Sequence, residues 1–263
     1  MPSTNSASSN ARPRIVVLAL IGVAGGLLSG MFGVGGGIIL VPLLMAFVGL
    51  DQKRAAATSL LAILPTAISG SVTYALHGEI DYVAAGIVAV GAIGGAFIGT
   101  ALLRRIPIAW LRWIFIALLV VVAARMLFLE PERGEPLPLT WLLAGAYVLL
   151  GLVMGIASGL LGVGGGIIAV PALVALFGIS DLIAKGTSLL VMVPTTISGT
   201  ISNKRAGLVD VRTGLIVGAA AAVASIGGAT IALALPSRVA AILFAVFLVG
   251  IAIQLAIRAL RAR

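Results

Sequence analysis

A fourteen-residue segment rich in glycine occurs twice in this chain, and it limits what the chain can fold into. It reads Ser-Gly-Met-Phe-Gly-Val-Gly-Gly-Gly-Ile-Ile-Leu-Val-Pro at Ser29–Pro42 and returns at Ser158–Pro171, 129 residues later, with 11 of 14 positions identical. A second segment repeats at the same offset, because Thr58–Gly70 and Thr187–Gly199 agree at 9 of 13 positions. Such copies indicate that the chain consists of two related halves.

The glycines of each motif predict a break in a helix. Glycine can adopt positive φ and has no side chain to separate the backbone from its neighbours. An apolar run precedes each motif and another follows it. We therefore expect two half-helices around each break, at Ile15–Leu28 and Ile38–Leu50 in the first half, and at Leu139–Ala157 and Ile167–Phe177 in the second.

Composition places these breaks in a membrane. Of the 263 residues, 61% are hydrophobic and only 10% are charged, whereas about a quarter of a soluble domain is charged. Apolar runs of about 20 residues, long enough to cross a ~30 Å hydrocarbon core, recur along the chain. The fold class predicted is an all-α polytopic membrane protein, with further spans at Thr58–Leu76, Tyr82–Leu103, Ile108–Leu129, Thr187–Ile201, Thr213–Leu235 and Val239–Ile257.

The boundaries of the two repeats follow from these spans. Residues 1–13 are predicted to form a disordered cytoplasmic tail, and residues 14–129 the first transmembrane repeat. A charged, proline-containing linker at 130–138 separates it from the second repeat at 139–258. Residues 259–263 are predicted to form a short cytoplasmic C-terminus.

Basic residues indicate how the motifs enter the membrane. If each pair of half-helices forms a re-entrant hairpin, each repeat has three full spans and the second repeat is inverted. With the N-terminus inside, 13 Lys and Arg residues are then cytoplasmic and 4 are not, whereas one broken span per motif gives 10 and 7. The positive-inside bias favours inverted repeats in a cell (inner) membrane with both termini cytoplasmic. One broken span per motif stays open as the alternative, because Leu139–Ala157 is long enough to span the membrane on its own.

The doubled motif also carries a family resemblance. Two copies of Gly-x-Gly-Gly-Gly-x-x-x-Val-Pro, each followed by a Thr-Ser-rich helix containing proline, resemble the sulfite exporter TauE/SafE family of membrane permeases over roughly residues 14–258. The resemblance implies a permease for small sulfur-containing anions such as sulfite or organosulfonates.

The motifs are also the candidate substrate site. Each glycine run directly precedes a half-helix, whose free N–H groups and positive dipole end attract anions. Hydroxyl groups on the following helices are candidate donors, and two prolines are expected to kink those helices. There are two alternatives to a substrate site. The glycines can serve tight helix packing, and the hydroxyls can form hydrogen bonds within their own helices. The candidate substrate-binding residues are Gly35, Gly36, Gly37, Gly164, Gly165, Gly166, Thr58, Ser59, Thr187, Ser188, Thr66 and Thr195, and the kinks are Pro65 and Pro194.

The predicted span centres lack ionisable side chains, which usually mark proton relays and coupling-ion sites. The single histidine, His77, falls in a short connection beside Glu79 and Asp81. No nucleophile–base pair, metal-ligand spacing or complete nucleotide-binding loop is present, so neither an enzyme nor a cofactor is expected. The partners expected are a small anionic substrate and the lipid bilayer, not nucleic acid, with a homodimer as one alternative.

These observations favour a uniporter or exporter that binds a small anion near the midplane, between the two repeats. The membrane potential alone favours expelling an anion, by about 2.3 kcal/mol per charge per 100 mV. Two alternatives are an anion channel and a membrane assembly subunit that transports nothing.

Overall fold

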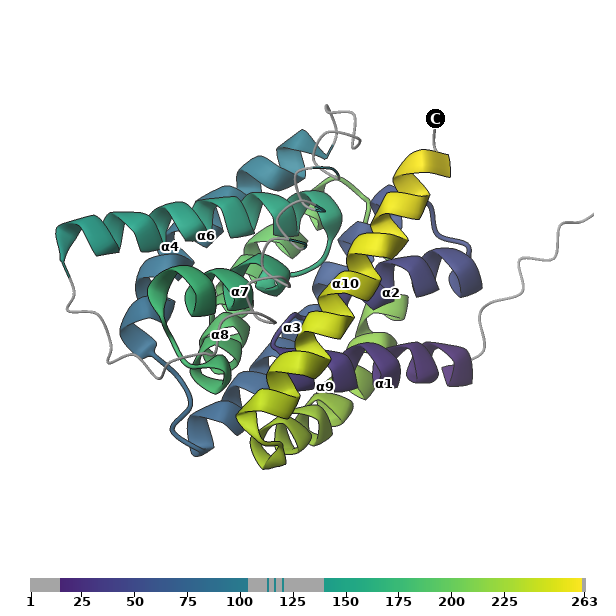
Figure 1. Cartoon of the computed structure of the whole chain (residues 1–263). Helices are drawn as coiled ribbons and strands as arrows, with labels where there is room; N and C mark the ends of the chain where they lie inside the picture. Colours follow the sequence, from purple (N-terminus) through teal and green to yellow (C-terminus); the bar gives the residue numbers. More distant parts are fainter. Residues whose placement is uncertain (1–14, 104–112, 114–115, 117–119, 121–139, 262–263) are drawn as a thin grey trace, which may run out of the picture.

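We describe a computed structural model of the 263-residue chain, covering residues 15–103, 113, 116, 120 and 140–261. Most of these residues lie in α-helices (Figure 1). Six of the described helices are long and apolar enough to cross a membrane. In order, the helices are α1 (Ile15–Phe32), α2 (Gly37–Leu43), η1 (Leu44–Val48, a π-helix), α3 (Gln52–Leu76), α4 (Tyr82–Leu102), α6 (Trp141–Leu161), α7 (Gly166–Phe177), α8 (Asp181–Arg205), α9 (Val211–Ala234) and α10 (Ser237–Arg261).

Apolar side chains cover the outside of this bundle. Leu149 on α6 is 60% exposed, Val90 on α4 is 67% exposed and Val223 on α9 is 73% exposed. An apolar surface of this extent is typical of contact with lipid. The prediction of an all-α polytopic membrane protein is confirmed. The tail at 1–13, the linker at 130–138 and most of the predicted span Ile108–Leu129 lie outside the described residues.

The first arm of each glycine motif is longer than the half-helix predicted from the sequence. α1 and α6 continue four residues past Leu28 and Ala157, and end at Phe32 and Leu161. At about 1.5 Å per residue, both helices are close to 30 Å long. The first glycine of each motif stays helical, because Gly30 and Gly159 pack against neighbouring helices. The helices end only at Gly33 and Gly162, which have positive φ.

The helices after the hairpins begin earlier than predicted. α3 starts at Gln52, where the Asp51 carboxylate accepts hydrogen bonds from the N–H groups of Lys53 and Arg54. α8 starts at Asp181 after the N-cap Ser180. Each helix thus gains six residues over the ranges beginning at Thr58 and Thr187. As a consequence, Asp181 and Lys185 lie in a helix and not in a loop.

Glycine faces join the two repeats. Gly22, Gly26 and Gly30 of α1 lie against the backbone of α9, and the equivalent Gly151, Gly155 and Gly159 of α6 lie against α4. A Cβ atom on Gly26 would lie 2.1 Å from the carbonyl oxygen of Ala221. Helix backbones in membranes approach this closely where small residues repeat every four positions. The first helix of each repeat therefore packs on the fourth helix of the other repeat.

These contacts also define the directions of the helices. Along α1, the glycines at 22, 26 and 30 face residues 217, 221 and 225 of α9, so α1 and α9 run in the same direction. On α9, Gly214 and Gly218 face Leu61 and Pro65, so α3 shares that direction too. α8 runs opposite to α3, because Leu60 contacts Gly199 whereas Gly70 contacts Leu189. The equivalent helices α3 and α8 thus run in opposite directions, which supports the prediction of inverted repeats.

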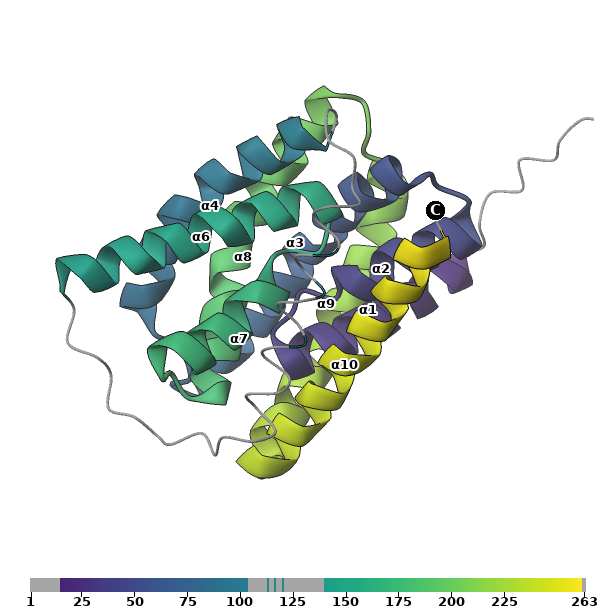
Figure 2. The same ribbon diagram turned by 45° about the horizontal axis from the view of Figure 1, so that its top comes forward.

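The bundle has α3 and α8 at its centre. Figures 1 and 2 show α4 and α6 side by side at one end of the molecule and α1 and α9 at the other, where α10 lies outermost. Phe247 of α10 stacks on Phe32 of α1, with ring centroids 4.6 Å apart. The two glycine motifs lie between these end pairs, against α3 and α8.

Candidate functional site

The two glycine motifs contact each other at the centre of the bundle. A Cβ atom on Gly37 would lie 2.4 Å from the carbonyl oxygen of Gly162, and one on Gly166 would lie 2.4 Å from the oxygen of Gly33. The contact is symmetric, since each pair becomes the other after a shift of 129 residues. A single anion site between the two repeats requires the motifs to lie close together, and the structure brings them into contact.

Each loop turns back along the helix that precedes it. Gly36, with φ of 67°, caps α2 and lies against the backbone of Gly25 in the middle of α1. Gly165, with φ of 86°, caps α7 and lies against Met154 of α6 in the same way. A side chain at either position would meet both the neighbouring helix and an unfavourable backbone conformation. These glycines are therefore needed for the fold, whatever they bind.

Both helix starts carry backbone donors that the fold does not use. The carbonyl oxygen of Gly36 accepts hydrogen bonds from the third and fourth residues of α2, and Gly165 does the same for α7. In the described part of the chain, no backbone oxygen accepts a hydrogen bond from the N–H groups of the first two residues, Gly37 and Ile38 or Gly166 and Ile167. All four residues are buried. Buried N–H groups without a partner are rare and attract an anion or ordered water.

Ile63 of α3 and Met192 of α8 close over the meeting point of the loops. They are equivalent residues of the two repeats, and both are fully buried. The Met192 Sδ atom would lie 2.8 Å from a Cβ on Gly35 and 3.2 Å from one on Gly164, and Ile63 Cγ2 would lie 3.3 Å from both. The centre is thus closed by one apolar side chain from each repeat.

Ser59 and Ser188 fasten each loop to the opposite repeat. The Ser188 hydroxyl donates to the carbonyl oxygen of Gly33 over 3.0 Å, and the Ser59 hydroxyl donates to that of Gly162. Both serines lie at the predicted site and are buried. Each hydroxyl donates to the first carbonyl oxygen of a loop, so these two serines position the loops.

Thr58 and Thr187 contact a different part of the fold. The Thr58 Oγ1 atom accepts a hydrogen bond from the N–H of Asp210 over 3.0 Å, and Thr187 Oγ1 accepts one from Asp81 over 2.9 Å. Asp81 and Asp210 are the N-caps of α4 and α9. Each threonine thus ties its repeat to a helix start in the other repeat, away from the glycine loops.

Thr66 and Thr195 bond within their own helices. Their hydroxyls donate to the carbonyl oxygens of Ala62 and Val191, four residues earlier, over 3.0 and 2.7 Å. This is the alternative that the sequence left open for these hydroxyls. α3 and α8 continue through Pro65 and Pro194 without a break, and the kinks expected there stay predictions.

Two serines that were not among the candidate residues lie on the helices before the glycine loops. The hydroxyls of Ser29 and Ser158 are buried and make no hydrogen bond within the described residues. Ser29 follows Gly25 by one helical turn, and Ser158 follows Met154, so both lie on the helix faces that the glycine loops cover. They are equivalent residues, and each begins its copy of the repeated motif. That position is the sequence signal that could have identified them.

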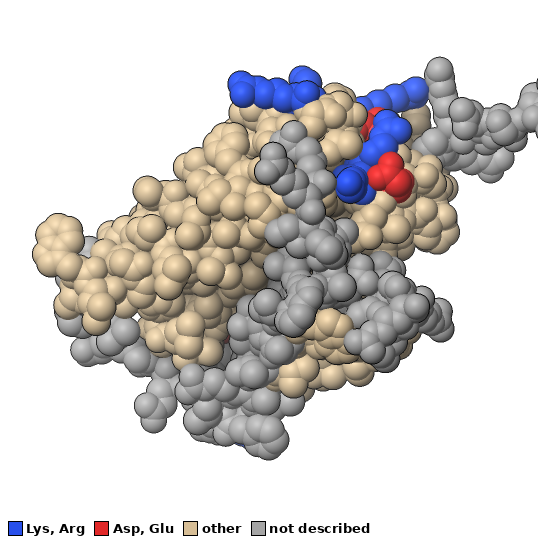
Figure 3. All heavy atoms as spheres, turned by 90° about the horizontal axis from the view of Figure 1, so that it is seen from above, with Lys and Arg blue, Asp and Glu red and all other residues tan. Residues whose placement is uncertain are grey.

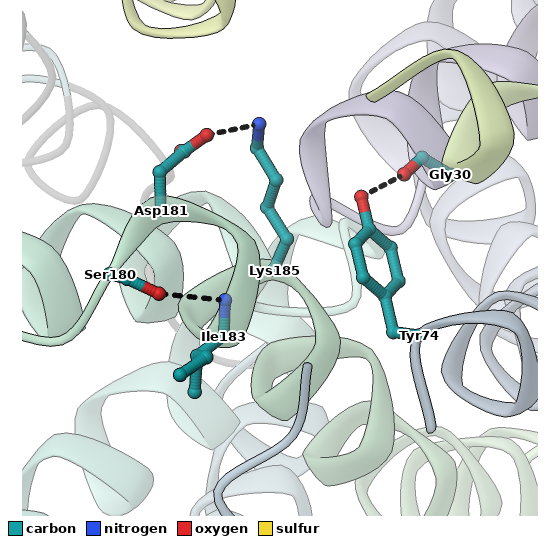
Figure 4. Close-up of polar contacts among 6 residues, drawn as sticks. All are labelled: Gly30, Tyr74, Ser180, Asp181, Ile183 and Lys185. Carbon is teal, nitrogen blue, oxygen red and sulfur yellow. Dashed lines mark hydrogen bonds and ion pairs between the residues drawn. The ribbon is translucent and has the colours of Figure 1, made fainter. Parts of the chain in front are cut away.

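An ion pair inside α8 contradicts one expectation from the sequence. Lys185 Nζ lies 2.6 Å from Asp181 Oδ2, and both side chains are buried (Figure 4). The span predicted from the sequence begins at Thr187, so both residues were expected to precede the helix. The N-cap Ser180 instead starts the helix one and a half turns earlier.

Exposed charges gather at one end of the bundle. The start of α3, the end of α8 and the start of α9 meet there, since Thr58 contacts Asp210 and Leu60 contacts Gly199. Figure 3 shows the described Lys and Arg side chains along one edge of the face in view, with little charge elsewhere on it. The exposed basic residues of this end are Lys53, Arg54, Lys204, Arg205 and Arg212.

The fold and the central contact define a class of protein: a multi-pass helical membrane protein in which two repeats bring non-helical backbone together in the interior. Such backbone is tolerated at membrane depth only where protein or a water-filled path surrounds it, and paired helix breaks between repeats are typical of transporters. Comparison with known families agrees with this class. The family described as sulfite exporter TauE/SafE matches residues 2–126 and 147–263, and the chain belongs to this family.

Relatives named as membrane transporters come from distant organisms. The chain is 26% identical over 219 residues to the probable membrane transporter protein YunE of Bacillus subtilis, which covers 74% of this chain and 80% of the relative. It is 31% identical to a probable membrane transporter protein of Xylella fastidiosa, covering 73% of each chain. It is 27% identical to the probable membrane transporter protein MJ0441 of Methanocaldococcus jannaschii, covering 71% of each. No solved structure shows a significant match to this chain. The protein is thus a membrane transporter, and not an enzyme.

Proposed function

We propose that this transporter is a permease for small sulfur-containing anions, bound where the two glycine motifs meet. The observation that carries the proposal is the symmetric set of buried, unused donors at this point. It comprises the first N–H groups of α2 and α7 and the hydroxyls of Ser29 and Ser158. Donors of this kind bind sulfite or sulfonate oxygens. The family description supports the sulfur-containing class of substrate.

Transport through this site requires the centre to open. Ile63 and Met192 lie against both loops, so an anion reaches the backbone donors only when one of these side chains moves aside. Methionine is unbranched and adapts its shape easily. We propose that each repeat opens the site to one side of the membrane, as inverted repeats do in other transporters.

The orientation in the membrane is part of the same proposal. Five exposed basic residues lie at the end of the bundle where α3 and α9 begin, and the positive-inside bias makes this the cytoplasmic end. Two transmembrane repeats at 14–129 and 139–258, in a cell (inner) membrane with cytoplasmic termini, agree with that orientation. A homodimer remains an open alternative to a monomer.

Flux into liposomes tests the substrate class. Purified protein is reconstituted, and uptake of sulfite, sulfoacetate, sulfate and small carboxylates is measured against protein-free liposomes. We expect saturable uptake of the sulfur-containing anions and no uptake of cations. Uptake that never saturates and shows no exchange would favour the anion channel. Monodisperse protein that moves none of these anions would favour an assembly subunit.

A further inference from the structure

The buried pair of Asp181 and Lys185 lies one turn apart at the start of α8. Figure 4 shows the Lys185 ammonium beside the Asp181 carboxylate, with Nζ 2.6 Å from Oδ2. The exposed fraction of the two side chains is 1% for lysine and 7% for aspartate. Withdrawing two charges from water costs several kcal/mol, which their attraction does not reliably recover. Ionisable residues inside a membrane protein therefore most often mark a functional site.

The pair is not fully satisfied by the protein. The Oδ1 atom of Asp181 is buried and has no hydrogen-bond partner within the described residues. A buried carboxylate oxygen normally accepts at least one hydrogen bond. The carboxyl group of Asp181 thus keeps one buried oxygen atom that no described residue uses.

The fold of α8 does not require the pair. The equivalent positions of the first repeat hold Gln52 and Ala56, and α3 forms the same 25-residue helix with these residues. Other contacts at the start of α8 do have equivalents in α3, including the hydroxyls of Thr187 and Ser188. The charges are thus an addition to one repeat of an otherwise symmetric arrangement.

Lys185 lies directly against the first glycine motif. A Cβ atom on Gly33 would lie 2.7 Å from the Cα atom of Lys185, and Ser188, less than one turn further, bonds the Gly33 carbonyl. The backbone of Lys185 therefore lies against the first glycine motif, and the side chain is long enough for its ammonium to move away from Asp181.

Other titratable groups lie on or beside the helices that pack against α8. Tyr74 of α3 lies close enough to interact electrostatically with Asp181, and its hydroxyl donates to the Gly30 carbonyl over 2.9 Å. Glu79 and Asp81 lie in the connection after α3, and Tyr147 of α6 interacts with Asp81. The sequence of α7 has no titratable side chain. Asp181 is the carboxylate paired with a buried cation.

We propose that this pair couples the anion to a proton, so that the two move across the membrane together. The arriving anion takes the Lys185 ammonium from Asp181, and the Asp181 carboxylate, left without its partner in a buried site, binds one proton from the same side. The site gains one negative and one positive charge, so its net charge is unchanged. Release on the other side reverses both steps, and the ion pair forms again.

This inference rests on the proposed function, and one assay separates the two. Methanesulfonate serves as the probe, because its single charge does not change between about pH 5 and 8. Liposomes containing the full-length protein and a trapped pH dye receive this anion with and without an imposed proton gradient. We expect inward acidification together with uptake, and an inward proton gradient of one unit should support up to about tenfold accumulation. Uptake without any proton movement would overturn the coupling and leave the permease standing.

Variants locate the coupling at the pair. Asp181→Asn should abolish the acidification and bring the ratio of uptake with and without the gradient to about one. Asp181→Asn leaves a buried lysine unpaired, so the double variant Asp181→Gln with Lys185→Ala provides a second measurement. This double variant carries the residue types found at the equivalent positions of the first repeat, Gln52 and Ala56. The same loss of gradient dependence is expected there. Asp51→Asn, which changes an exposed N-cap, should retain the wild-type ratio. Full proton coupling in the double variant would overturn the proposal.

Discussion

At the scale of single residues, hydroxyl groups that look alike in the sequence have different partners in the structure. Thr58 and Thr187 hold the opposite repeat, Thr66 and Thr195 bond within their helices, and Ser29 and Ser158 bond nothing in the described residues. A hydroxyl without a partner is the one that a substrate can use. The sequence cannot distinguish these cases, because the difference lies in the direction of each side chain.

Ser29→Ala and Ser158→Ala test this distinction. Each removes one free hydroxyl at nearly constant volume, so we expect the apparent affinity for the transported anion to fall about fivefold, which corresponds to about 1 kcal/mol. Concentration-dependent uptake into liposomes measures the change. Thr66→Val is the matched control, since its hydroxyl bonds its own helix, and its apparent affinity should equal that of the wild type. Equal values for all three variants would remove the serines from the site.

Thr58→Val should affect stability more than transport. The hydroxyl accepts a hydrogen bond from the N–H of Asp210, and such bonds in membrane proteins contribute roughly 0.6 kcal/mol on average. We expect a small decrease in the thermal unfolding temperature of the detergent-solubilised protein and an unchanged apparent affinity. A large loss of affinity with unchanged thermal stability would place Thr58 at the substrate after all.

At the scale of helices, the spacing of glycine explains how the repeats assemble. Gly95 of α4 and Gly228 of α9 lie against backbone oxygens of α6 and α1, whereas the adjacent Gly94 and Gly227 have no neighbour within 4 Å of a Cβ atom. Adjacent glycines thus differ in the space available to a methyl group. We expect Gly95→Ala and Gly228→Ala to lower the thermal unfolding temperature, and Gly94→Ala and Gly227→Ala to leave it unchanged. Equal stability of all four variants would contradict the packing described.

Much of the helical layout could be predicted from the sequence, and the parts that could not have physical causes. Apolar runs predicted α4 and α9 to within a few residues, because lipid-exposed helices need about 20 apolar residues. The predicted start of α8 was wrong, because two charged residues close together in the chain are typical of a polar loop. Only the structure shows that Asp181 and Lys185 pair with each other inside the helix. The predicted ends of α1 and α6 were also wrong, because Gly30 and Gly159 read as helix breakers although they serve close packing.

The same helix contacts change how the glycine motifs should be tested. Gly36 has a positive φ, and Gly36→Val would place a side chain there against the backbone of Gly25. Its loss of flux would therefore follow from a disturbed fold as well as from a blocked path. Met192→Ala avoids this problem, since it empties the space between Gly35 and Gly164. We expect it to raise the uptake of bulky organosulfonates relative to sulfite, whereas the exposed Ile68→Ala on α3 should not change that ratio.

At the scale of the whole molecule, an inverted arrangement of the repeats predicts which residues are reached from each side. The chain has no cysteine, so single introduced thiols report their own position. His77 is exposed at the end opposite to the basic residues, and Lys53 and Lys204 are exposed among them. An impermeant thiol reagent should label His77→Cys from outside intact cells, but not Lys53→Cys or Lys204→Cys. Labelling of Lys53→Cys from outside would contradict the inverted arrangement.

The most direct test of the central claim is counterflow of labelled sulfite. Liposomes containing the purified protein are loaded with unlabelled sulfite and diluted into a trace of labelled sulfite. A transporter with one central anion site exchanges the two, so we predict that label accumulates transiently inside the liposomes. An excess of unlabelled sulfite outside should abolish this accumulation. Entry of label that follows only its own gradient, in protein shown to be folded and active in net uptake, would contradict a bound anion between the two repeats.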